Sequence, residues 1–261
     1  MDHFAAAAAL ARYQRHRIEG TFFPPDWEET LTVDEAYALQ LAVLDQRVER
    51  GSRRIGWKVG LTAKPIQEQF NVHEPGFGFL LDDAPHASGD AIAFAPLISP
   101  GLENELCMTM GAALAGPGVT FDAAAAAIAT VAPAFELIET RGDSRGNLAK
   151  GIPDNLQQKG IILGTPVPFP GLPDLAEVRV RFAINGEPTD EGAGASVLGH
   201  PLNSVVWLAN KLAEYGRSVA AGDLIMTGSF IRQYAVAAGD VMHAEFDGVG
   251  MVEARFPDCS D

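Results

Sequence analysis

Residues 102–110 read LENELCMTM, and this stretch decides the fold because it places two carboxylates inside a β-prone apolar run. Side chains i and i+2 of a strand point to the same face, so a strand here projects Glu103 and Glu105 side by side. Glu136 lies in a second apolar run, APAFELI at residues 132–138. Burying an isolated carboxylate in such surroundings is costly. The two runs therefore predict strands that carry three acidic groups in apolar surroundings.

Two interpretations of these glutamates are open from the residues alone. Anions that lie so close repel each other unless a proton or a cation lies between them. A hard divalent cation satisfies this need, and Mg²⁺ commonly uses few protein carboxylates and leaves positions for a substrate. The alternative is that the glutamates point outward on a half-exposed strand. The E-x-E spacing by itself favours this alternative, whereas the apolar setting of Glu136 makes the two interpretations equal.

The rest of the chain predicts helices first and strands afterwards. An alanine-rich helix is expected over residues 2–20, and the TVDE capping box at residues 32–35 begins a second helix that ends before Gly51. Strands are expected at 55–62, 91–97, 102–110, 130–138, 160–163, 178–184, 224–227, 241–246 and 251–256, with helices after Thr120 and Pro201. This pattern predicts an α+β fold, with a helical N-terminal region (residues 1–54) and a β-rich catalytic body (residues 55–261) in one structural unit.

The composition indicates which classes of partner and which cellular compartment to expect. The net charge of −15 argues against nucleic acid and anionic membrane as partners. An acidic protein that handles an anionic substrate needs local positive charge, so a metal ion or a placed lysine is required. The two cysteines form no metal-binding or redox spacing, and the simplest compartment is a reducing cytoplasm. No segment of the sequence has the roughly 20 apolar residues that span a bilayer.

Lys58 is a candidate for proton transfer. It lies in GWKVGLT at residues 56–62, between a tryptophan and a valine that could desolvate its amine. Desolvation lowers the pKa of a lysine, which suits proton transfer near neutral pH. The alternative is a snorkelling lysine whose stem covers apolar surface, and the residues alone favour that alternative.

Two further polar segments have a functional and an ordinary interpretation. Asp154 precedes an apolar run and could orient a ligand, although an Asx turn is the simpler explanation. The TGS segment at residues 227–229 could offer backbone N–H groups to an anion, or form a plain turn. The sequence has no nucleophile elbow, P-loop or dinucleotide fingerprint. Nucleophilic hydrolysis and nicotinamide chemistry are therefore unsupported.

Five motifs together resemble a known family. They are GWKVGLT at 56–62, the pair Glu103 and Glu105, ELI at 136–138 followed by Arg141, Asp154-Asn155, and the run from LGHP to VWLANKL at 198–212. In this order they resemble the 2-keto-4-pentenoate hydratase / 4-oxalocrotonate decarboxylase family, within the fumarylacetoacetate hydrolase superfamily. The resemblance covers about residues 32–256. It implies a mixed β-roll or sandwich body of the fumarylacetoacetate hydrolase C-terminal type, preceded by helices.

The resemblance also implies an activity and a site. The activity is that of a lyase of aromatic-compound catabolism, which adds water to a small anionic 2-hydroxy-2,4-dienoate (a 2-keto-4-enoate) through a metal-chelated dienolate. A homo-oligomer is implied, with association with a neighbouring pathway enzyme as an open addition. The implied site consists of Mg²⁺ (or Mn²⁺) on Glu103, Glu105 and Glu136, proton transfer by Lys58, and substrate contacts from Thr62, Arg141, Asp154 and Ser229.

The chain departs from the family pattern at two glycines. Hydratases that resemble it usually carry an aspartate within Glu-Pro-Asp-aromatic-Gly, whereas residues 74–78 read EPGFG and leave Gly76 in that place. Decarboxylases of the family tend to lack this aspartate, so decarboxylation of a 4-oxalocrotonate-type 2-oxo acid is the alternative activity. Gly101 stands where a basic residue often precedes the E-x-E strand. A catalytically silent partner of a pathway enzyme is the remaining alternative.

Overall fold

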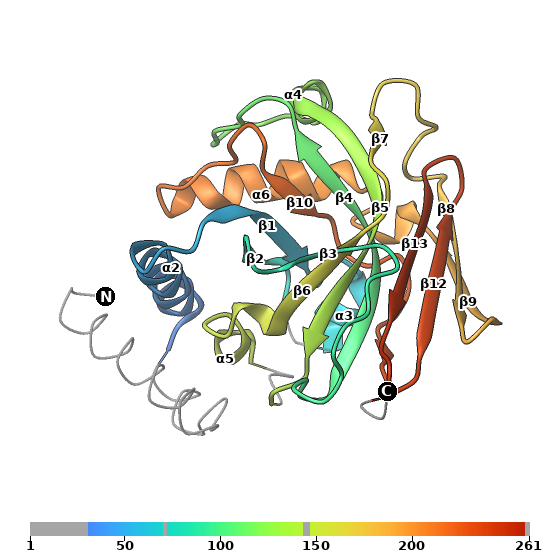
Figure 1. Cartoon of the computed structure of the whole chain (residues 1–261). Helices are drawn as coiled ribbons and strands as arrows, with labels where there is room; N and C mark the ends of the chain where they lie inside the picture. Colours follow the sequence, from blue (N-terminus) through green and yellow to red (C-terminus); the bar gives the residue numbers. More distant parts are fainter. Residues whose placement is uncertain (1–30, 70–71, 143–146, 259–261) are drawn as a thin grey trace.

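A computed structural model describes residues 31–69, 72–142 and 147–258 of the chain. Its body contains a curled nine-stranded mixed sheet with a four-stranded antiparallel sheet beside it (Figure 1). The central path of the large sheet has the order β2-β1-β10-β4-β5-β6-β3, with β11 paired to β4 and β7 to β5. The small sheet has the order β13-β12-β8-β9. Among the described elements, α2 precedes the sheets and the other helices lie between strands, without regular alternation of strand and helix, so the α+β prediction is confirmed.

The elements have the following bounds. The large sheet consists of β1 (Arg54–Gly60), β2 (Gly76–Leu81), β3 (Pro85–Ala87), β4 (Pro100–Met110), β5 (Ile128–Glu139), β6 (Gln158–Leu163), β7 (Val167–Pro168), β10 (Leu224–Met226) and β11 (Tyr234–Ala235). The small sheet consists of β8 (Arg179–Ile184), β9 (Glu187–Ala193), β12 (Val241–Phe246) and β13 (Gly250–Arg255). The helices are α2 (Val33–Glu49), α3 (Lys64–Gln69), α4 (Phe121–Ala127), α5 (Leu148–Gly151) and α6 (Leu202–Glu214), with 3₁₀ turns η2 (Asn155–Gln157) and η3 (Gly194–Ser196).

Helix α2 begins where its capping box predicts and packs on the body. The Glu35 N–H donates to Thr32 Oγ1 over 3.2 Å, and the Glu35 carboxylate accepts from the Thr32 N–H over 2.9 Å. The buried Gln40 amide donates to the carbonyl oxygens of Phe77 (3.1 Å) and Ile152 (2.8 Å). These bonds join the helix to β2 and to the end of α5. The division of the chain at residue 54, where β1 begins, stays a prediction.

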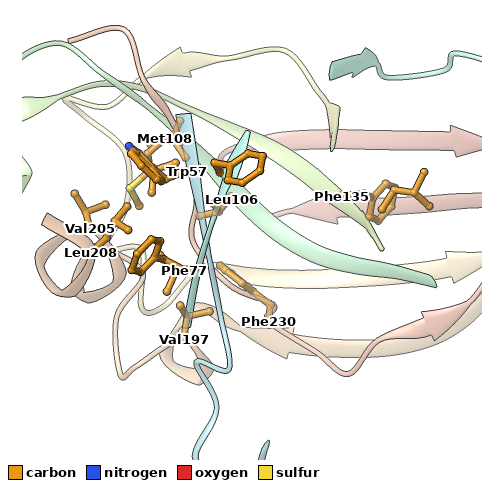
Figure 2. Close-up of a cluster of buried hydrophobic side chains, with 14 of the residues drawn as sticks. Trp57, Phe77, Leu106, Met108, Phe135, Val197, Val205, Leu208 and Phe230 are labelled. Carbon is orange, nitrogen blue, oxygen red and sulfur yellow. The ribbon is translucent and has the colours of Figure 1, made fainter. Parts of the chain in front are cut away.

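The two faces of the large sheet have different chemistry. One face carries the main apolar core, in which Trp57 and Phe77 pack near Val205 and Leu208 of α6 (Figure 2). Farther along this face Phe135 meets Phe182 of the small sheet, with ring centroids 6.2 Å apart. Because side chains alternate along a strand, the intervening residues of β1, β4 and β5 project to the opposite face. The polar residues of the site described below lie on that opposite face.

Two elements of the fold differ from the sequence prediction. The predicted strand at 91–97 is wrong: only Ala91 forms an isolated bridge, and a turn closed by the Leu97 N–H and the Phe94 carbonyl interrupts the run. Strand β2 was not anticipated, because its glycines conceal the alternation of a strand. The helix expected over residues 2–20 lies outside the described residues.

Candidate metal and substrate site

The three glutamates come together on neighbouring strands. In the antiparallel register of β4 and β5, Glu103 lies opposite Glu136 and Glu105 lies opposite Ala134. One carboxylate oxygen of each glutamate lies within 4.8 Å of the others. Glu105 and Glu136 are completely buried, and Glu103 is partly exposed. The interpretation in which these side chains point outward on a half-exposed strand is therefore wrong.

The electrostatics of this group fit a divalent cation. Burial raises the pKa of all three carboxyl groups, with repulsion from Glu136 adding to the effect on the other two. The pKa of Glu103 rises to about 7. Glu105 Oε1 and Glu136 Oε2 are buried and accept no hydrogen bond from the described residues. Buried carboxylate oxygens without donors, aimed into one space, are the ligands that Mg²⁺ or Ca²⁺ prefers.

Lys58 supplies the positive charge beside the glutamates. Its Nζ lies 3.3 Å from Glu136 Oε1 and donates to the Leu156 carbonyl oxygen over 3.3 Å. The Lys58 side chain is only 4% exposed, so the interpretation of a snorkelling lysine with a solvated head is wrong. Its charge lowers the pKa of all three glutamates and so opposes the effect of burial. The amine thus lies at the edge of the acidic group, in reach of a ligand held there.

Glycines make room around this lysine. A Cβ on Gly78 would lie 3.2 Å from Lys58 Cε, and a Cβ on Gly60 would lie 3.4 Å from its Nζ. A Cβ on Gly76 would lie 2.8 Å from Leu156 Cδ1. The sheet next to the lysine is therefore free of side chains at these three positions. The place of the carboxylate missing at Gly76 is closed by an apolar side chain.

A strained turn directs the carbonyl oxygen that Lys58 contacts. Asn155, Leu156 and Gln157 have φ angles of 57°, 49° and 65°, a left-handed conformation that costs free energy in residues other than glycine. The Asn155 side chain compensates by bonding both backbone groups of Phe79, at 2.8 and 2.9 Å. Sequence reasoning singled out the Asp154-Asn155 pair but missed this clamp. The tolerance of asparagine for left-handed backbone is the one signal that could have suggested it.

Two of the residues expected to contact substrate are Arg141 and Asp154. They contact each other directly before the strained turn, which Asp154 precedes. Arg141 Nε donates to Asp154 Oδ2 over 2.6 Å, and its Nη1 donates to Glu139 Oε2 over 2.6 Å. The side chains of Arg141 and Asp154 are 3% and 2% exposed. Their shared effect is to hold the start of the strained turn, and direct contact with a substrate stays a prediction.

Of the other two, Ser229 lies in the loop after β10, and Thr62, which follows β1, packs against that loop. A Cβ on Gly228 would lie 2.9 Å from Thr62 Cβ, so the threonine side chain packs directly on this glycine. The Gly228 N–H donates to Glu105 Oε2 over 2.8 Å. The Ser229 hydroxyl accepts from the Asn104 N–H over 3.1 Å. The loop does offer a backbone N–H to an anion, and that anion is the protein's own carboxylate.

Comparison with known proteins places this arrangement in a family. Residues 47–257 match the family described as fumarylacetoacetate (FAA) hydrolase C-terminal. The chain belongs to this family. The assignment confirms the resemblance stated from the motifs and the predicted class of body. In this member of the fumarylacetoacetate hydrolase family, none of the described helices is long and apolar enough to cross a bilayer.

Relatives of this family member include hydratases and decarboxylases. It is 36% identical over 248 residues to 2-hydroxyhexa-2,4-dienoate hydratase of Comamonas testosteroni, with 94% of each chain covered. It is 37% identical over 250 residues to 4-oxalocrotonate decarboxylase of Pseudomonas putida, with 95% of this chain and 92% of the relative covered. The solved 4-oxalocrotonate decarboxylase from Pseudomonas putida G7, complexed with magnesium and adipate, superposes with a TM-score of 0.91 at 32% identity over 98% of each chain. Both kinds of relative are lyases, as the predicted enzyme class requires.

Proposed function

We propose that the chain is a metal-dependent lyase that adds water to a 2-hydroxy-2,4-dienoate. The observation that carries this proposal is the buried convergence of Glu103, Glu105 and Glu136 beside the amine of Lys58. The names of two relatives, one of each chemistry, state a 2-hydroxydienoate as the substrate of hydration and 4-oxalocrotonate as the substrate of decarboxylation. The proposed substrate is therefore a small anionic dienoate that enters as its 2-hydroxy or 2-oxo form.

The residues divide the work between holding a cation and moving a proton. Glu103, Glu105 and Glu136 would hold Mg²⁺, which when bound supplies a Lewis acid for the carboxylate and 2-oxygen of the substrate. Lys58 holds a proton at Nζ, and the Leu156 carbonyl oxygen fixes the direction of that amine. In hydration, Lys58 gives this proton to the far carbon of the dienoate and recovers one as the 2-hydroxyl group loses its proton, and water then adds across the remaining double bond of the conjugated ketone.

The inner end of the site is apolar, and Lys58 and Asn155 cover the glycines beside it. A Cβ on Gly78 would lie 2.7 Å from Asn155 Oδ1 and 3.2 Å from Lys58 Cε, so these two side chains fill the space that Gly78 leaves. Leu80, Cys107 and Met226, all buried, close the inner end of the same face. Exclusion of bulk water there strengthens the electrostatic effect of Lys58 and protects the reactive enol from unwanted protonation.

Decarboxylation of a 4-oxalocrotonate-type oxo acid is the second candidate, favoured by one observation. Gly76 has no side chain, and Leu156 occupies the adjoining space, so the carboxylate expected of a hydratase is missing and cannot be added without moving a leucine. Loss of carbon dioxide needs no group to activate water, whereas hydration does. Lys58 would then protonate the carbon left behind.

We also propose Mg²⁺ as the resident ion, with Mn²⁺ as the alternative. A solved relative carries magnesium, and three carboxylates leave coordination positions open for substrate. The homo-oligomer, the association with a pathway enzyme and the cytoplasmic location remain predictions.

One paired assay tests both candidates. The Mg²⁺-loaded protein is given 2-hydroxypenta-2,4-dienoate while ultraviolet absorbance is followed, and 4-oxalocrotonate while carbon dioxide is collected. Loss of dienoate absorbance with formation of the 4-hydroxy-2-oxo acid supports the hydratase, and carbon dioxide release without hydration supports the decarboxylase. Absence of turnover of both substrates with Mg²⁺ and with Mn²⁺ contradicts the proposed function. Glu105→Gln is the matched inactive control.

A further inference from the structure

Gln233 is an exposed residue that lies against Gly101, at the start of the strand that carries Glu103 and Glu105, although it is distant from them in sequence. Strand β11 pairs with β4 in an antiparallel register, with Tyr234 opposite Leu102 and Ala235 opposite Gly101. Gln233 comes directly before β11. Backbone bonds on both sides of it, from the Val236 N–H to the Pro100 oxygen and from the Phe230 N–H to the Asn104 oxygen, hold this segment along the first residues of β4.

The side chain of Gln233 lies on the same face as the glutamates. Gly101 precedes Glu103 by two residues, so a side chain at Gly101 would point to the face that carries Glu103 and Glu105. A Cβ built there would lie 2.9 Å from Gln233 Cδ and 3.0 Å from its Cγ. The side chain of Gln233 therefore fills the space that Gly101 leaves empty, in line with the acidic group.

The site opens in this direction. Along the inner face of β4, Cys107 and Glu105 are buried, Glu103 is partly exposed, and Gln233 beyond it is exposed. At the opposite end of this face of the sheet, the site is closed by Met226 and by the buried apolar side chains that pack with it. Two residues of a strand span about 6.6 Å. A ligand whose head lies among the glutamates thus reaches Gln233 with a tail a few carbon atoms long.

We propose that Gln233 determines which substrate tail is accepted, in an inference that rests on the proposed function. Its amide is neutral, offers two N–H donors and one carbonyl acceptor, and fills the space over Gly101, two residues before Glu103 on the same face of β4. A neutral donor at this place can bond a terminal carboxylate of the substrate, which a second acidic side chain would repel. The substrate class is then a 2-oxo acid or 2-hydroxydienoate with a carboxylate at its far end. Gly101 contributes because it has no side chain, which leaves space for the amide of Gln233.

Binding measurements on the full-length Mg²⁺-loaded protein test this proposal without relying on turnover. Isothermal titration compares oxalate, which has only the chelating head, with 2-oxoadipate and 2-oxohexanoate, which have equal length but end in a carboxylate and a methyl group. The wild type is expected to bind 2-oxoadipate about tenfold more tightly than 2-oxohexanoate, the effect of a hydrogen bond to a charged group. Gln233→Ala should reduce this preference to about twofold, and Gln233→Glu should reverse it, while oxalate affinity stays unchanged.

Two further variants make the result specific. Gly101→Ala should weaken the preference like Gln233→Ala, because the added methyl group displaces the amide. Arg232→Ala is the matched control, since the Arg232 side chain instead contacts Tyr234, to whose hydroxyl its Nε donates over 3.0 Å, and it should leave the preference intact. Equal binding of the two oxo acids by the wild type, or an unchanged preference in Gln233→Ala, overturns the inference. Failure of the wild type to bind oxalate contradicts the proposed function instead.

Discussion

Lys58 Nζ lies 3.3 Å from Glu136 Oε1, with the two side chains 4% and 0% exposed. Removing one member of such a buried pair leaves an uncompensated charge, which is strongly destabilising. Here the pair is one edge of a larger acidic group, because Glu103 and Glu105 share the same space. One lysine cannot neutralise three carboxylates, and the remaining negative charge is what a divalent cation would offset.

Replacing Glu105 by glutamine should separate its effects on metal binding and on folding. The loss of a charged ligand should lower Mg²⁺ affinity and turnover by orders of magnitude. Without metal, the same variant should be more stable than the wild type, because burial disfavours the charged carboxylate of Glu105. Titration calorimetry and thermal unfolding with and without Mg²⁺ measure the two effects. Glu245→Gln, on the exposed face of β12, is the control. Unchanged metal content together with unchanged turnover in Glu105→Gln would refute the ligand assignment.

Lys58→Met should slow the chemical step with little change in Mg²⁺ affinity. General acid–base groups typically contribute about 10²- to 10⁴-fold to a rate, and methionine keeps most of the apolar stem that packs over Gly78. Single-turnover kinetics and metal titration on the same preparation measure the two quantities. If the variant instead loses only thermal stability and keeps its turnover, the lysine is a structural partner of Glu136.

The stability of the metal-free protein should fall as the pH rises from about 4.5 toward 7. Burial raises the pKa of Glu103 from 4.5 to about 7, so the folded state binds more protons than the unfolded state in this window. The stability contributed by the protonated carboxyl group is fully present below the unfolded pKa and is lost as the pH rises through the folded pKa. Thermal unfolding from pH 4 to 8 with a chelator should show a steeper decline for the wild type than for Glu103→Gln. Identical pH profiles for the two proteins would contradict the assignment of this decline to Glu103.

Asn155→Ala should lower turnover and not stability alone. The variant loses both hydrogen bonds to Phe79, which hold the Leu156 carbonyl oxygen toward Lys58. An unsatisfied buried backbone group costs about 1–3 kcal/mol, so the melting temperature should also fall. The matched control is Asn185→Ala, which removes an asparagine of similar left-handed φ (53°) from an exposed hairpin.

Turnover and its pH profile at a temperature where both variants are folded distinguish the two asparagines. The profile should change for Asn155→Ala and stay that of the wild type for Asn185→Ala, because only Asn155 positions a group that contacts Lys58. Equal effects of the two substitutions on turnover would show that the clamp serves the fold alone.

Local rules written in the sequence were sufficient for several elements. The capping box from Thr32 to Glu35 fixed the start of α2, because its bonds join residues three apart. The alternation of strands placed Glu103 and Glu105 on one face, and Asn185-Gly186 turned β8 into β9. Each of these features depends on neighbours along the chain, and steric and hydrogen-bonding preferences at short range decide them.

The site itself was decided by contacts between distant parts of the chain. Lys58 meets Glu136 although β10 and β4 lie between β1 and β5 in the curled sheet, an arrangement that no local spacing encodes. The left-handed turn at Asn155 and the placement of Gln233 against Gly101 likewise arise from contacts between remote segments. The same distinction holds for the glutamates. The sequence by itself determined that Glu103 and Glu105 share one face of a strand, and only the tertiary structure placed Glu136 beside them and withdrew the group from water. The physical reason is that the free energy of a charge depends on everything packed around it, which no stretch of neighbouring residues contains.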